Sequence, residues 1–296
     1  MKKLLTGTIR SMALVALATS FAVSATPKSG GKINVVIQPE PPGLMLGITQ
    51  NGPTAMVASN IYESLLRYGN DLKPLPALAK SWTRSDDGLT YTFNLQENVK
   101  WHDGASFSAH DVVFSADVFL RKTHPRLRVS LAHVESITAP DDSTVVFKLK
   151  NPFGPFLGVF EAGTMPIVPK HIWQGKKAET FTNFDMAKGW PVVSGPYEMV
   201  LSTPQQRIWD LREGWWAQKA GFKEMPKVER IIYLPFMEET KRVQNLLTNN
   251  LDSCLDMRPP NIRTIIEGNP KVSSWTGRQA PFGYLDWWPI SLGFNA

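Results

Sequence analysis

The amino-acid sequence predicts a mixed α/β (α+β) fold, and three observations carry that prediction. Several short segments, such as residues 89–95, alternate apolar with polar residues, which is typical of half-buried strands. Other segments, such as residues 238–251, place apolar residues three or four positions apart, as an amphipathic helix does. The two kinds of segment are mixed along the chain without an internal repeat, which favours the mixed classes over all-α and all-β folds.

The first elements are expected between residues 32 and 67. Residues 32–37 have the pattern of a buried strand, and a turn rich in proline and glycine follows at residues 38–46. Val57, Ile61 and Leu65 then fall on one face of a helix that we expect to end near Arg67.

A hairpin and a capped helix are expected next. Asp87-Gly88 is a turn signal between apolar runs, because glycine accepts a positive φ. After a loop at residues 98–104, Ser108 and Asp111 have the spacing of a capping box. The helix that they begin would have one apolar face, made of Val112, Val113, Ala116, Phe119 and Leu120.

The second half of the chain continues the mixed pattern. A short helix is expected at residues 169–173, where Pro169 lies near the first turn. The long helix at residues 238–251 would bury Val243, Leu246, Leu247 and Leu251. Further strands are expected at residues 143–149, 207–211, 228–235, 271–276 and 284–294.

Composition and charge exclude some classes of protein. The chain has 296 residues, and 43% of them are apolar, which is enough for one large domain or two smaller ones. Its basic residues are dispersed and form no stripe with aromatic residues, so we expect no nucleic-acid partner. The one cysteine, Cys254, has no partner for an internal disulfide and is expected to be a small buried apolar residue.

The N-terminus has the three parts of a secretory signal peptide. Lys2, Lys3 and Arg10 form a basic region, residues 12–23 are apolar, and Val23-Ser24-Ala25 fits a cleavage site. Removing residues 1–25 leaves 29 basic against 26 acidic residues, a net charge of +3 rather than +6. No cysteine follows the site for acylation, so we expect a soluble periplasmic protein rather than a lipoprotein. No later stretch approaches the ~20 apolar residues of a transmembrane helix.

Motifs of catalysis are not found in the sequence. It has no G-x-S-x-G, P-loop or G-x-G-x-x-G motif, and Asp111 is better explained as a helix cap than as part of a catalytic pair. His102 and His110 lie eight positions apart, which is not the spacing of a helical metal pair. No spacing supports metal ligation by His124, His133 or His171 either, so no enzyme activity, metal site or cofactor is expected.

A series of short motifs gives the chain a resemblance to a known family. In order, they are Pro41-Pro42-Gly43-Leu44, Tyr62-Glu63-Ser64-Leu65-Leu66, Leu78-Ala79-Lys80-Ser81-Trp82, Trp101-His102-Asp103-Gly104, Ser194-Gly195-Pro196-Tyr197, residues 210–216, residues 249–256 and Gly293-Phe294-Asn295. In order and spacing they resemble the family 5 extracellular solute-binding proteins, the receptors of ABC importers for oligopeptides, dipeptides, nickel complexes or oligosaccharides. The resemblance covers essentially all of residues 32–295.

The resemblance implies a clamshell of the periplasmic-binding-protein type II kind, in which two lobes close on a ligand and then dock on a membrane permease. Family members are about twice this long, so the chain is expected to hold most of lobe I and none of lobe II. Residues 26–61 and 191–296 would form the sheet subdomain of lobe I, and residues 62–190 would form a subdomain inserted into it. The protein is expected to be a monomer.

The resemblance also implies a set of ligand-binding residues. The loop after the first strand lines the cleft in this family and contributes Glu40, Pro41, Pro42 and Leu44, although Glu40 is equally read as a solvated turn residue. The strand before Phe294-Asn295 lines the cleft as well and contributes Trp287, Trp288 and Ile290. Alternation places Trp288 and Ile290 on one face and Trp287 on the other, and we expect Trp288 to face the ligand. Arg258 would add a charge at the cleft or form a surface ion pair.

The ligand itself stays open between two chemical classes. An oligopeptide is the expected ligand, because most of the family is named for peptides. An oligosaccharide is the alternative, because Trp275, Trp287 and Trp288 offer flat aromatic faces. An alternative of another class is a secreted hydrolase or a carbohydrate-binding module.

Overall fold

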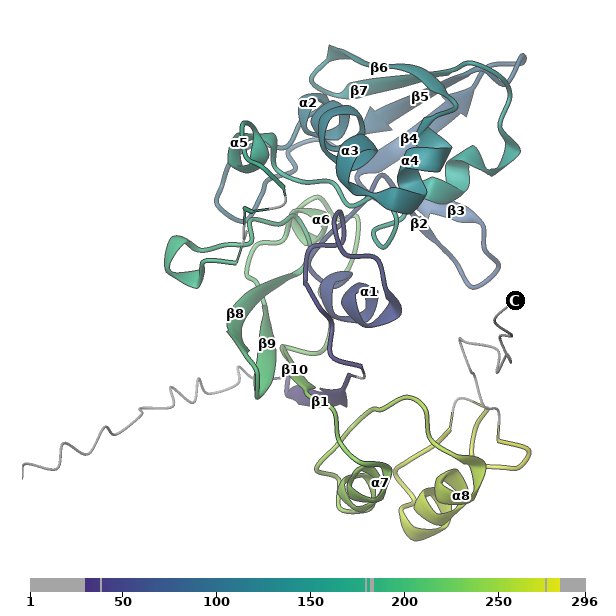
Figure 1. Cartoon of the computed structure of the whole chain (residues 1–296), viewed down its shortest axis with the longest axis vertical. Helices are drawn as coiled ribbons and strands as arrows, with labels where there is room; N and C mark the ends of the chain where they lie inside the picture. Colours follow the sequence, from purple (N-terminus) through teal and green to yellow (C-terminus); the bar gives the residue numbers. More distant parts are fainter. Residues whose placement is uncertain (1–29, 38, 179, 182–183, 275, 283–296) are drawn as a thin grey trace, which may run out of the picture.

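Two four-stranded sheets organise the chain, as the computed structural model in Figure 1 shows. The structure describes residues 30–37, 39–178, 180–181, 184–274 and 276–282. The second sheet and its helices lie at one end of the molecule, the first sheet lies in the middle, and two helices lie at the other end. The mixed α/β class predicted from the sequence is confirmed.

The first sheet has the strand order β1-β10-β9-β8. It consists of β1 (Lys32–Val36), β10 (Arg230–Leu234), β9 (Gln206–Leu211) and β8 (Tyr197–Thr203). β1 pairs in parallel with β10, so that Val36 lies opposite Leu234, and the other two pairs are antiparallel. The three strands predicted at residues 32–37, 207–211 and 228–235 are confirmed, and β8 was not predicted.

The second sheet is antiparallel, with the order β4-β5-β7-β6. It consists of β4 (Ala79–Arg84), β5 (Thr90–Leu95), β7 (Thr144–Leu149) and β6 (Val134–Asp141). Gly88 adopts a φ of +71° in the turn between β4 and β5, which confirms the predicted hairpin. Tyr91, Phe93 and Leu95 of β5 are buried, as their alternation predicts.

Helices cover one side of this second sheet. α2 (Ala109–Val113) continues as a π-helical turn, η1 (Phe114–Leu120), and as α3 (Arg121–Thr123), and α4 (Pro125–Leu131) follows. The capping box is confirmed: the Ser108 hydroxyl accepts from the His110 N–H at 3.3 Å, and the Asp111 carboxylate accepts from the Ser108 N–H at 2.9 Å. Four of the five residues of the predicted apolar face are buried, namely Val112, Ala116, Phe119 and Leu120.

Aromatic rings fill the space between the second sheet and the turn η2 (Gly154–Val159). The ring of Phe93 lies 4.7 Å from that of Phe160 and 5.7 Å from that of Phe147. Phe156 packs edge-on against Phe160 at 5.0 Å. These contacts belong to one large core that continues under the first sheet, so the two sheets share their hydrophobic interior.

The prediction that the first helix ends near Arg67 is wrong, because the helix is shorter. α1 (Gly52–Ala58) ends at Ala58, where the side chain of Asn60 turns back to donate to the Met56 carbonyl and to the Tyr233 hydroxyl. The chain then extends, and β2 (Leu66–Tyr68) pairs with β3 (Pro74–Pro76). Leu65 is buried as predicted, but by this extended segment rather than by a helical face.

The remaining helices are short. The predicted α5 (Lys170–Trp173) is confirmed, and it is followed by η3 (Met186–Lys188) and α6 (Trp216–Lys219). α7 (Glu239–Leu247) is shorter than predicted, because Asn249 adopts a left-handed φ of +58° just after it. α8 (Pro259–Gly268) was not predicted.

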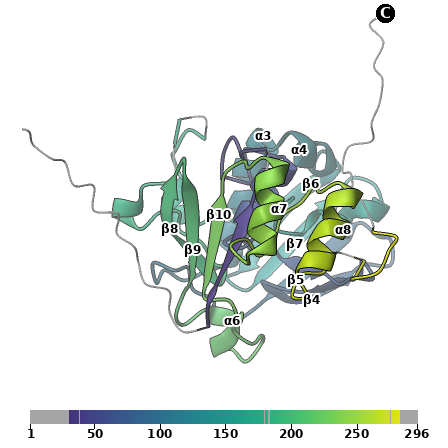
Figure 2. The same cartoon turned by 90° about the horizontal axis from the view of Figure 1, so that it is seen from below.

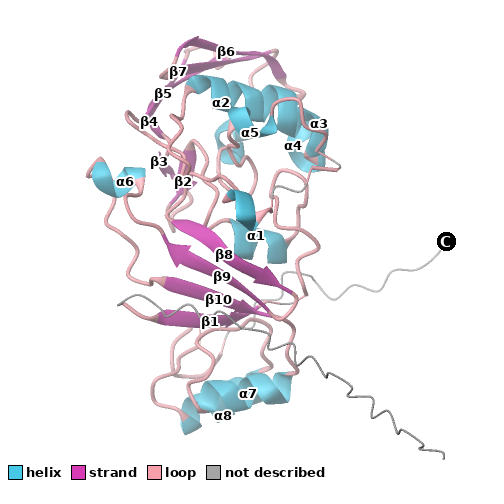
Figure 3. Ribbon diagram, turned by 90° about the vertical axis from the view of Figure 1, so that its left-hand side faces the viewer, coloured by secondary structure: helices cyan, strands magenta, loops and turns pink. Residues whose placement is uncertain are grey.

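The helices α7 and α8 lie beyond β1, at the end of the molecule away from the second sheet (Figures 1 and 3). In the view from below, both helices lie in front of the rest of the chain (Figure 2). They form a second small core with β1, made of Val36, Leu246, Leu251, Met257 and Ile265. Cys254 is partly buried against this core, as expected of it.

The strand predicted at residues 271–276 is wrong for the part that the structure describes. Ser274 and Gly277 exchange backbone hydrogen bonds in a tight turn, which leaves no extended run. The strand predicted at residues 284–294 lies outside the described residues. None of the helices in the described part of the chain is long and apolar enough to cross a bilayer.

Candidate functional site

The parallel pairing of β1 with β10 brings several segments to one edge of the first sheet (Figure 3). Residues 37–46 leave β1, and residues 235–238 leave β10, at the carboxyl ends of the two strands. β9 runs antiparallel to β10, so Arg207 near its start lies at the same edge. Ser253 pairs in parallel with β1, so the chain toward Arg258 leaves there as well. Because open α/β sheets bind ligands at the carboxyl ends of their strands, this carboxyl edge is the candidate site.

Glu40 and Arg207 form an ion pair at the carboxyl edge. Oε1 of Glu40 lies 2.5 Å from Nη1 of Arg207. The Arg207 side chain is 17% exposed and that of Glu40 is 44% exposed, so the carboxylate reaches solvent while the guanidinium is held inside. Nε of Arg207 is buried and has no hydrogen-bond partner among the described residues. The pair therefore offers an accessible acceptor, the Glu40 carboxylate, that is held in place by a largely buried guanidinium.

The other residues of the loop after β1 have different surroundings. Pro41 is buried and Pro42 is exposed, so of the two only Pro42 presents its ring to solvent. Leu44 is 6% exposed and belongs to the large hydrophobic core. Its apolar side chain packs where the loop turns under the sheet, so Leu44 supports the loop and is not available to a ligand.

Arg258 lies at the N-terminal end of α8 and is tied to α7. Its Nε lies 2.6 Å from Oε2 of Glu239, and the side chain of Asn261 donates to Oε1 of the same carboxylate at 2.6 Å. Burial raises the pKa of Glu239, but these hydrogen bonds and the charge of Arg258 outweigh it and lower the pKa to about 2. The ion pair that the sequence left as one alternative for Arg258 is thus present in the structure.

Phe236 is a large apolar side chain at the carboxyl edge that sequence reasoning missed. It lies two residues after the end of β10, and 57% of its surface is exposed. Arg207 was missed as well, because its place beside Glu40 depends on the pairing of β9 with β10 and of β10 with β1. The Pro-Phe-Met run after the strand is a weak sequence signal for Phe236, and no local signal marks Arg207.

Three of the predicted ligand-binding residues lie outside the described residues. They are Trp287, Trp288 and Ile290. Their assignment to the ligand site therefore stays a prediction.

The histidines and acids considered for catalysis have structural partners. His171 lies 2.7 Å from the Asp103 carboxylate, and the ring of His102 contacts the Gly189 carbonyl at 2.7 Å and the Val193 N–H at 3.2 Å. Asp111 also accepts from the Lys170 N–H, in addition to capping α2. Within the described ranges, no group of three or more His, Cys, Asp or Glu side chains is placed to hold a metal ion.

Comparison with known proteins gives the chain its relatives. Residues 73–290 match the family model of the bacterial extracellular solute-binding proteins, family 5 (middle). The chain is 30% identical over 251 residues to Protein XP55 of Streptomyces lividans, which covers 84% of this chain and 43% of that protein. It is 30% identical over 207 residues to the dipeptide-binding protein of Escherichia coli (strain K12), which covers 63% of this chain and 36% of that protein. The chain thus spans less than half the length of each of these relatives.

Solved structures show the same fold. The oligopeptide-binding protein AppA from Bacillus subtilis, in complex with a nonapeptide, superposes with a TM-score of 0.71 at 23% identity. The superposition covers 82% of this chain and 47% of that chain. It confirms the expected periplasmic-binding-protein type II architecture, of which the matched part is about one half.

Proposed function

Because the chain belongs to the bacterial extracellular solute-binding proteins, family 5, we propose that the protein captures a peptide-like solute outside the cytoplasmic membrane and delivers it to an ABC permease. Its ligand would bind at the carboxyl edge of the first sheet. There a second lobe would close over it, and the closed form would dock on the permease.

The observation that carries the choice of a peptide is the ion pair of Glu40 with Arg207. A peptide has a cationic amino group, and it has carbonyl or carboxylate oxygens a few atoms away. The exposed Glu40 carboxylate can accept from the ammonium group while it keeps Arg207, because a carboxylate has about four lone-pair sites. The largely buried guanidinium of Arg207 would hold the Glu40 carboxylate in place for that contact.

Two further features support a peptide. The exposed ring of Phe236 at the same edge offers an apolar surface for a peptide side chain. One of the relatives is named as a dipeptide-binding protein and is 30% identical over its aligned part. Pro42, Arg258, Trp287, Trp288 and Ile290 complete the proposed site, with Trp288 as its aromatic contact.

The proposed organisation follows from the same family. Residues 1–25 would be removed on export to the periplasm without lipid attachment. Residues 26–61 and 191–296 would form the sheet subdomain of lobe I, with residues 62–190 inserted between them. The strand composition supports this division, because β1 comes from the first range and β8, β9 and β10 come from the last. The protein would act as a monomer.

Native mass spectrometry of the protein purified from a periplasmic extract tests the function. We expect a bound species that fragments into amino acids. A bound species that fragments in hexose units would instead assign an oligosaccharide ligand, and turnover of a bound ester, peptide or glycoside would contradict a transport receptor.

A pair of matched variants tests the site. Glu40→Gln should weaken binding of the identified peptide at least fivefold, because the amide loses the charge that faces the ligand ammonium group. Glu135→Gln is the control, since Glu135 is also a half-exposed glutamate in an ion pair, with Lys148 at 3.1 Å in the second sheet. Equal affinities of the two variants for the peptide would overturn the role of Glu40.

A further inference from the structure

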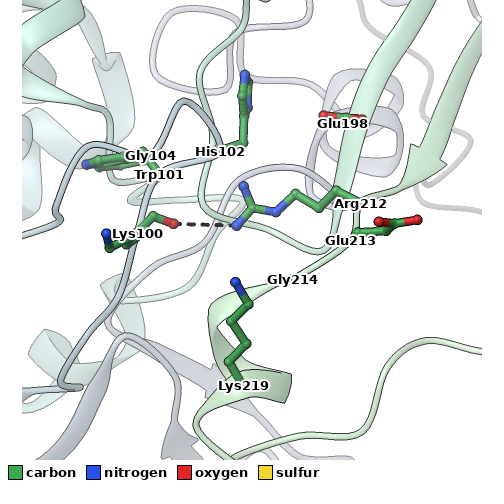
Figure 4. Close-up of a pocket in the computed structure, with 9 residues that line it drawn as sticks. All are labelled: Lys100, Trp101, His102, Gly104, Glu198, Arg212, Glu213, Gly214 and Lys219. Carbon is green, nitrogen blue, oxygen red and sulfur yellow. Dashed lines mark hydrogen bonds between the residues drawn. The ribbon is translucent and has the colours of Figure 1, made fainter.

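A cavity of about 470 Å³ lies at the edge of the first sheet opposite the carboxyl edge. The end of β9 and the start of β8 contribute Arg212 and Glu198, and the loop before α2 contributes Lys100 (Figure 4). Lys219 of α6 completes its basic side. Since β9 runs antiparallel to β10, this cavity and the proposed peptide site are at opposite ends of the same strands.

Arg212 is a buried cation with no ion pair among the residues that the structure describes. Arg212 as a whole is only 7% exposed, so its side chain is buried. The guanidinium donates to the carbonyl oxygens of Ser194 at 3.2 Å and of Val193 and Lys100 at 3.4 Å, and these are long hydrogen bonds to neutral groups. Nε has no partner, and no carboxylate of the described residues lies within 4 Å of the guanidinium. Burial lowers the pKa of Arg212, although the charges of Glu63, Glu198 and Asp103 act against this from beyond 4 Å. A closer counter-charge would stabilise the buried guanidinium further.

Lys219 brings a second positive charge to the same cavity. Its side chain lies across Gly214, where a Cβ atom would stand 2.7 Å from Nζ. A residue with a side chain at this position would displace the ammonium group, and Gly214 also has a φ of +69° that favours glycine. Figure 4 shows the Lys219 ammonium group pointing toward the Arg212 guanidinium. Two cations that face one cavity repel each other until an anion lies between them.

Acidic side chains also line the cavity and reduce its positive electrostatic potential. Glu198 and Glu213 are drawn on the far side of Arg212 from Lys100 (Figure 4). The lining sets Lys100, Arg212 and Lys219 against these two carboxylates, and the carboxylates of Asp103 and Glu63 act on Arg212 from outside the lining. The ring nitrogens of His102 are both engaged with the backbone, so His102 adds no free donor.

We propose that this cavity binds a small oxyanion, such as phosphate, sulfate or a carboxylate, between the Arg212 guanidinium and the Lys219 ammonium group. The planar guanidinium suits the oxygens of such an anion, and the ammonium group adds a point charge. The site is independent of the proposed peptide site, because it uses none of the residues of the carboxyl edge.

Isothermal titration at low ionic strength with sodium phosphate, sulfate and acetate tests the proposal, with chloride as the control for screening. We expect saturable 1:1 binding of at least one oxyanion and no comparable heat with chloride. Acetate distinguishes the two sources of the ligand: binding of acetate would point to the carboxylate of an organic molecule, whereas binding of phosphate or sulfate alone would point to the inorganic ion. Unsaturable heats with every salt would overturn the proposal.

Three variants test the geometry by the sign of their effects. Lys219→Ala should weaken binding of the oxyanion at least fivefold, because one of the two positive charges of the site is lost. Glu198→Gln should strengthen binding of the oxyanion about twofold or more, because a carboxylate that repels the anion is removed. Lys241→Ala is the matched control, since Lys241 is an exposed lysine of α7, far from the cavity. Equal affinities of the Lys219 and Lys241 variants, with unchanged thermal unfolding without anion, would overturn the proposal. Binding of peptide is measured in parallel, so that failure of either site is seen separately.

Discussion

The indole N–H of Trp216 donates a hydrogen bond of 2.8 Å to Oε2 of Glu63. This contact joins α6, which lies between β9 and β10 of the first sheet in the chain, to the extended segment that leads into β2. Glu63 borders a cavity but is surrounded by protein on most sides, and this burial raises its pKa to about 7 despite the hydrogen bond from Trp216, which lowers it. The junction between the two sheets therefore contains a carboxyl group that titrates near neutral pH.

The first prediction concerns the pH dependence that Glu63 adds to stability. Its pKa is raised from the ordinary 4.5 of a glutamate to about 7 in the folded protein, so the folded state binds more protons than the unfolded state between these pH values. The contribution of Glu63 is thus complete below about pH 4.5 and is lost as the pH rises through 7. Glu63→Gln stays neutral, so at pH 8 it should be more stable than the parent by up to about 3 kcal/mol.

Urea unfolding of the parent and of Glu63→Gln at pH 4.5, 6 and 8 measures this difference. We expect the two free energies of unfolding to be close at pH 4.5 and to separate as the pH rises. Glu135→Gln, which changes an exposed glutamate, controls for the loss of a surface charge. A parent-to-Gln difference that is constant with pH would contradict the raised pKa.

The second prediction concerns the close approach of two backbone segments. A Cβ atom at Gly195 would lie 2.6 Å from the carbonyl oxygen of Ile61, and the Gly195 N–H donates to that same carbonyl. The carbonyl oxygen is a backbone atom and cannot move aside as the end of a flexible side chain could. Gly195→Ala should therefore lower the free energy of unfolding by about 1–3 kcal/mol.

Gly154→Ala is the control for that substitution, because nothing lies within 4 Å of its added Cβ and its φ is not positive. Thermal and urea unfolding of both variants provide the comparison. Equal stability of the two variants would show that the backbone segments at Ile61 and Gly195 separate more easily than the structure implies.

The third prediction concerns the tie between α7 and α8. The pKa of Glu239 is about 2 in the folded protein, below the ordinary 4.5 of a glutamate. Its contribution to stability is therefore present above pH 4.5 and is lost as the pH falls toward 2. Arg258 is 75% exposed and screened by solvent, so Glu239→Gln should lower the free energy of unfolding at pH 7 by only about 1 kcal/mol. Denaturation at pH 7, 4 and 3 should show the deficit shrinking with acid, and a deficit that grows with acid would refute it.

The fourth prediction concerns the aromatic contact of the proposed ligand site. Trp288→Ala should weaken binding of the identified ligand by at least ~1 kcal/mol, because an aromatic side chain in a ligand contact carries a large share of the binding energy. Trp287→Ala, on the other face of the predicted strand, should change affinity less and stability more. Titration calorimetry on both variants decides the assignment, and an unchanged affinity of Trp288→Ala would remove Trp288 from the site.

The elements predicted well from the sequence are those whose determinants are local. The hairpin depends on Asp87-Gly88 and the alternation after it, and α2 depends on the pair Ser108 and Asp111. Each feature is made by residues within a few positions of one another, so a short stretch of sequence contains it in full. The family motifs extended this reach to the fold as a whole.

The misses have a common physical cause in contacts between distant segments. The end of α1 depends on the bond of Asn60 with Tyr233, and the place of Leu66 depends on its pairing in β2 with Pro76. Likewise, Glu40 could be proposed from its loop, but its partner Arg207 could not, because that contact requires the register of three strands. Leu44 looked accessible in the same loop because the sequence does not say on which side of the turn the core lies.

The parallel pairing of β1 with β10 also sets an order of events as the chain folds. Lys32 emerges early, yet it pairs with Arg230, and the other neighbour of β1 is the segment at Ser253. The second sheet draws all its strands from residues 79–149 and can form without either segment. We expect the second sheet to fold first, and β1 to wait, with its backbone donors and acceptors unpaired, until residues 230–253 are present to pair with it.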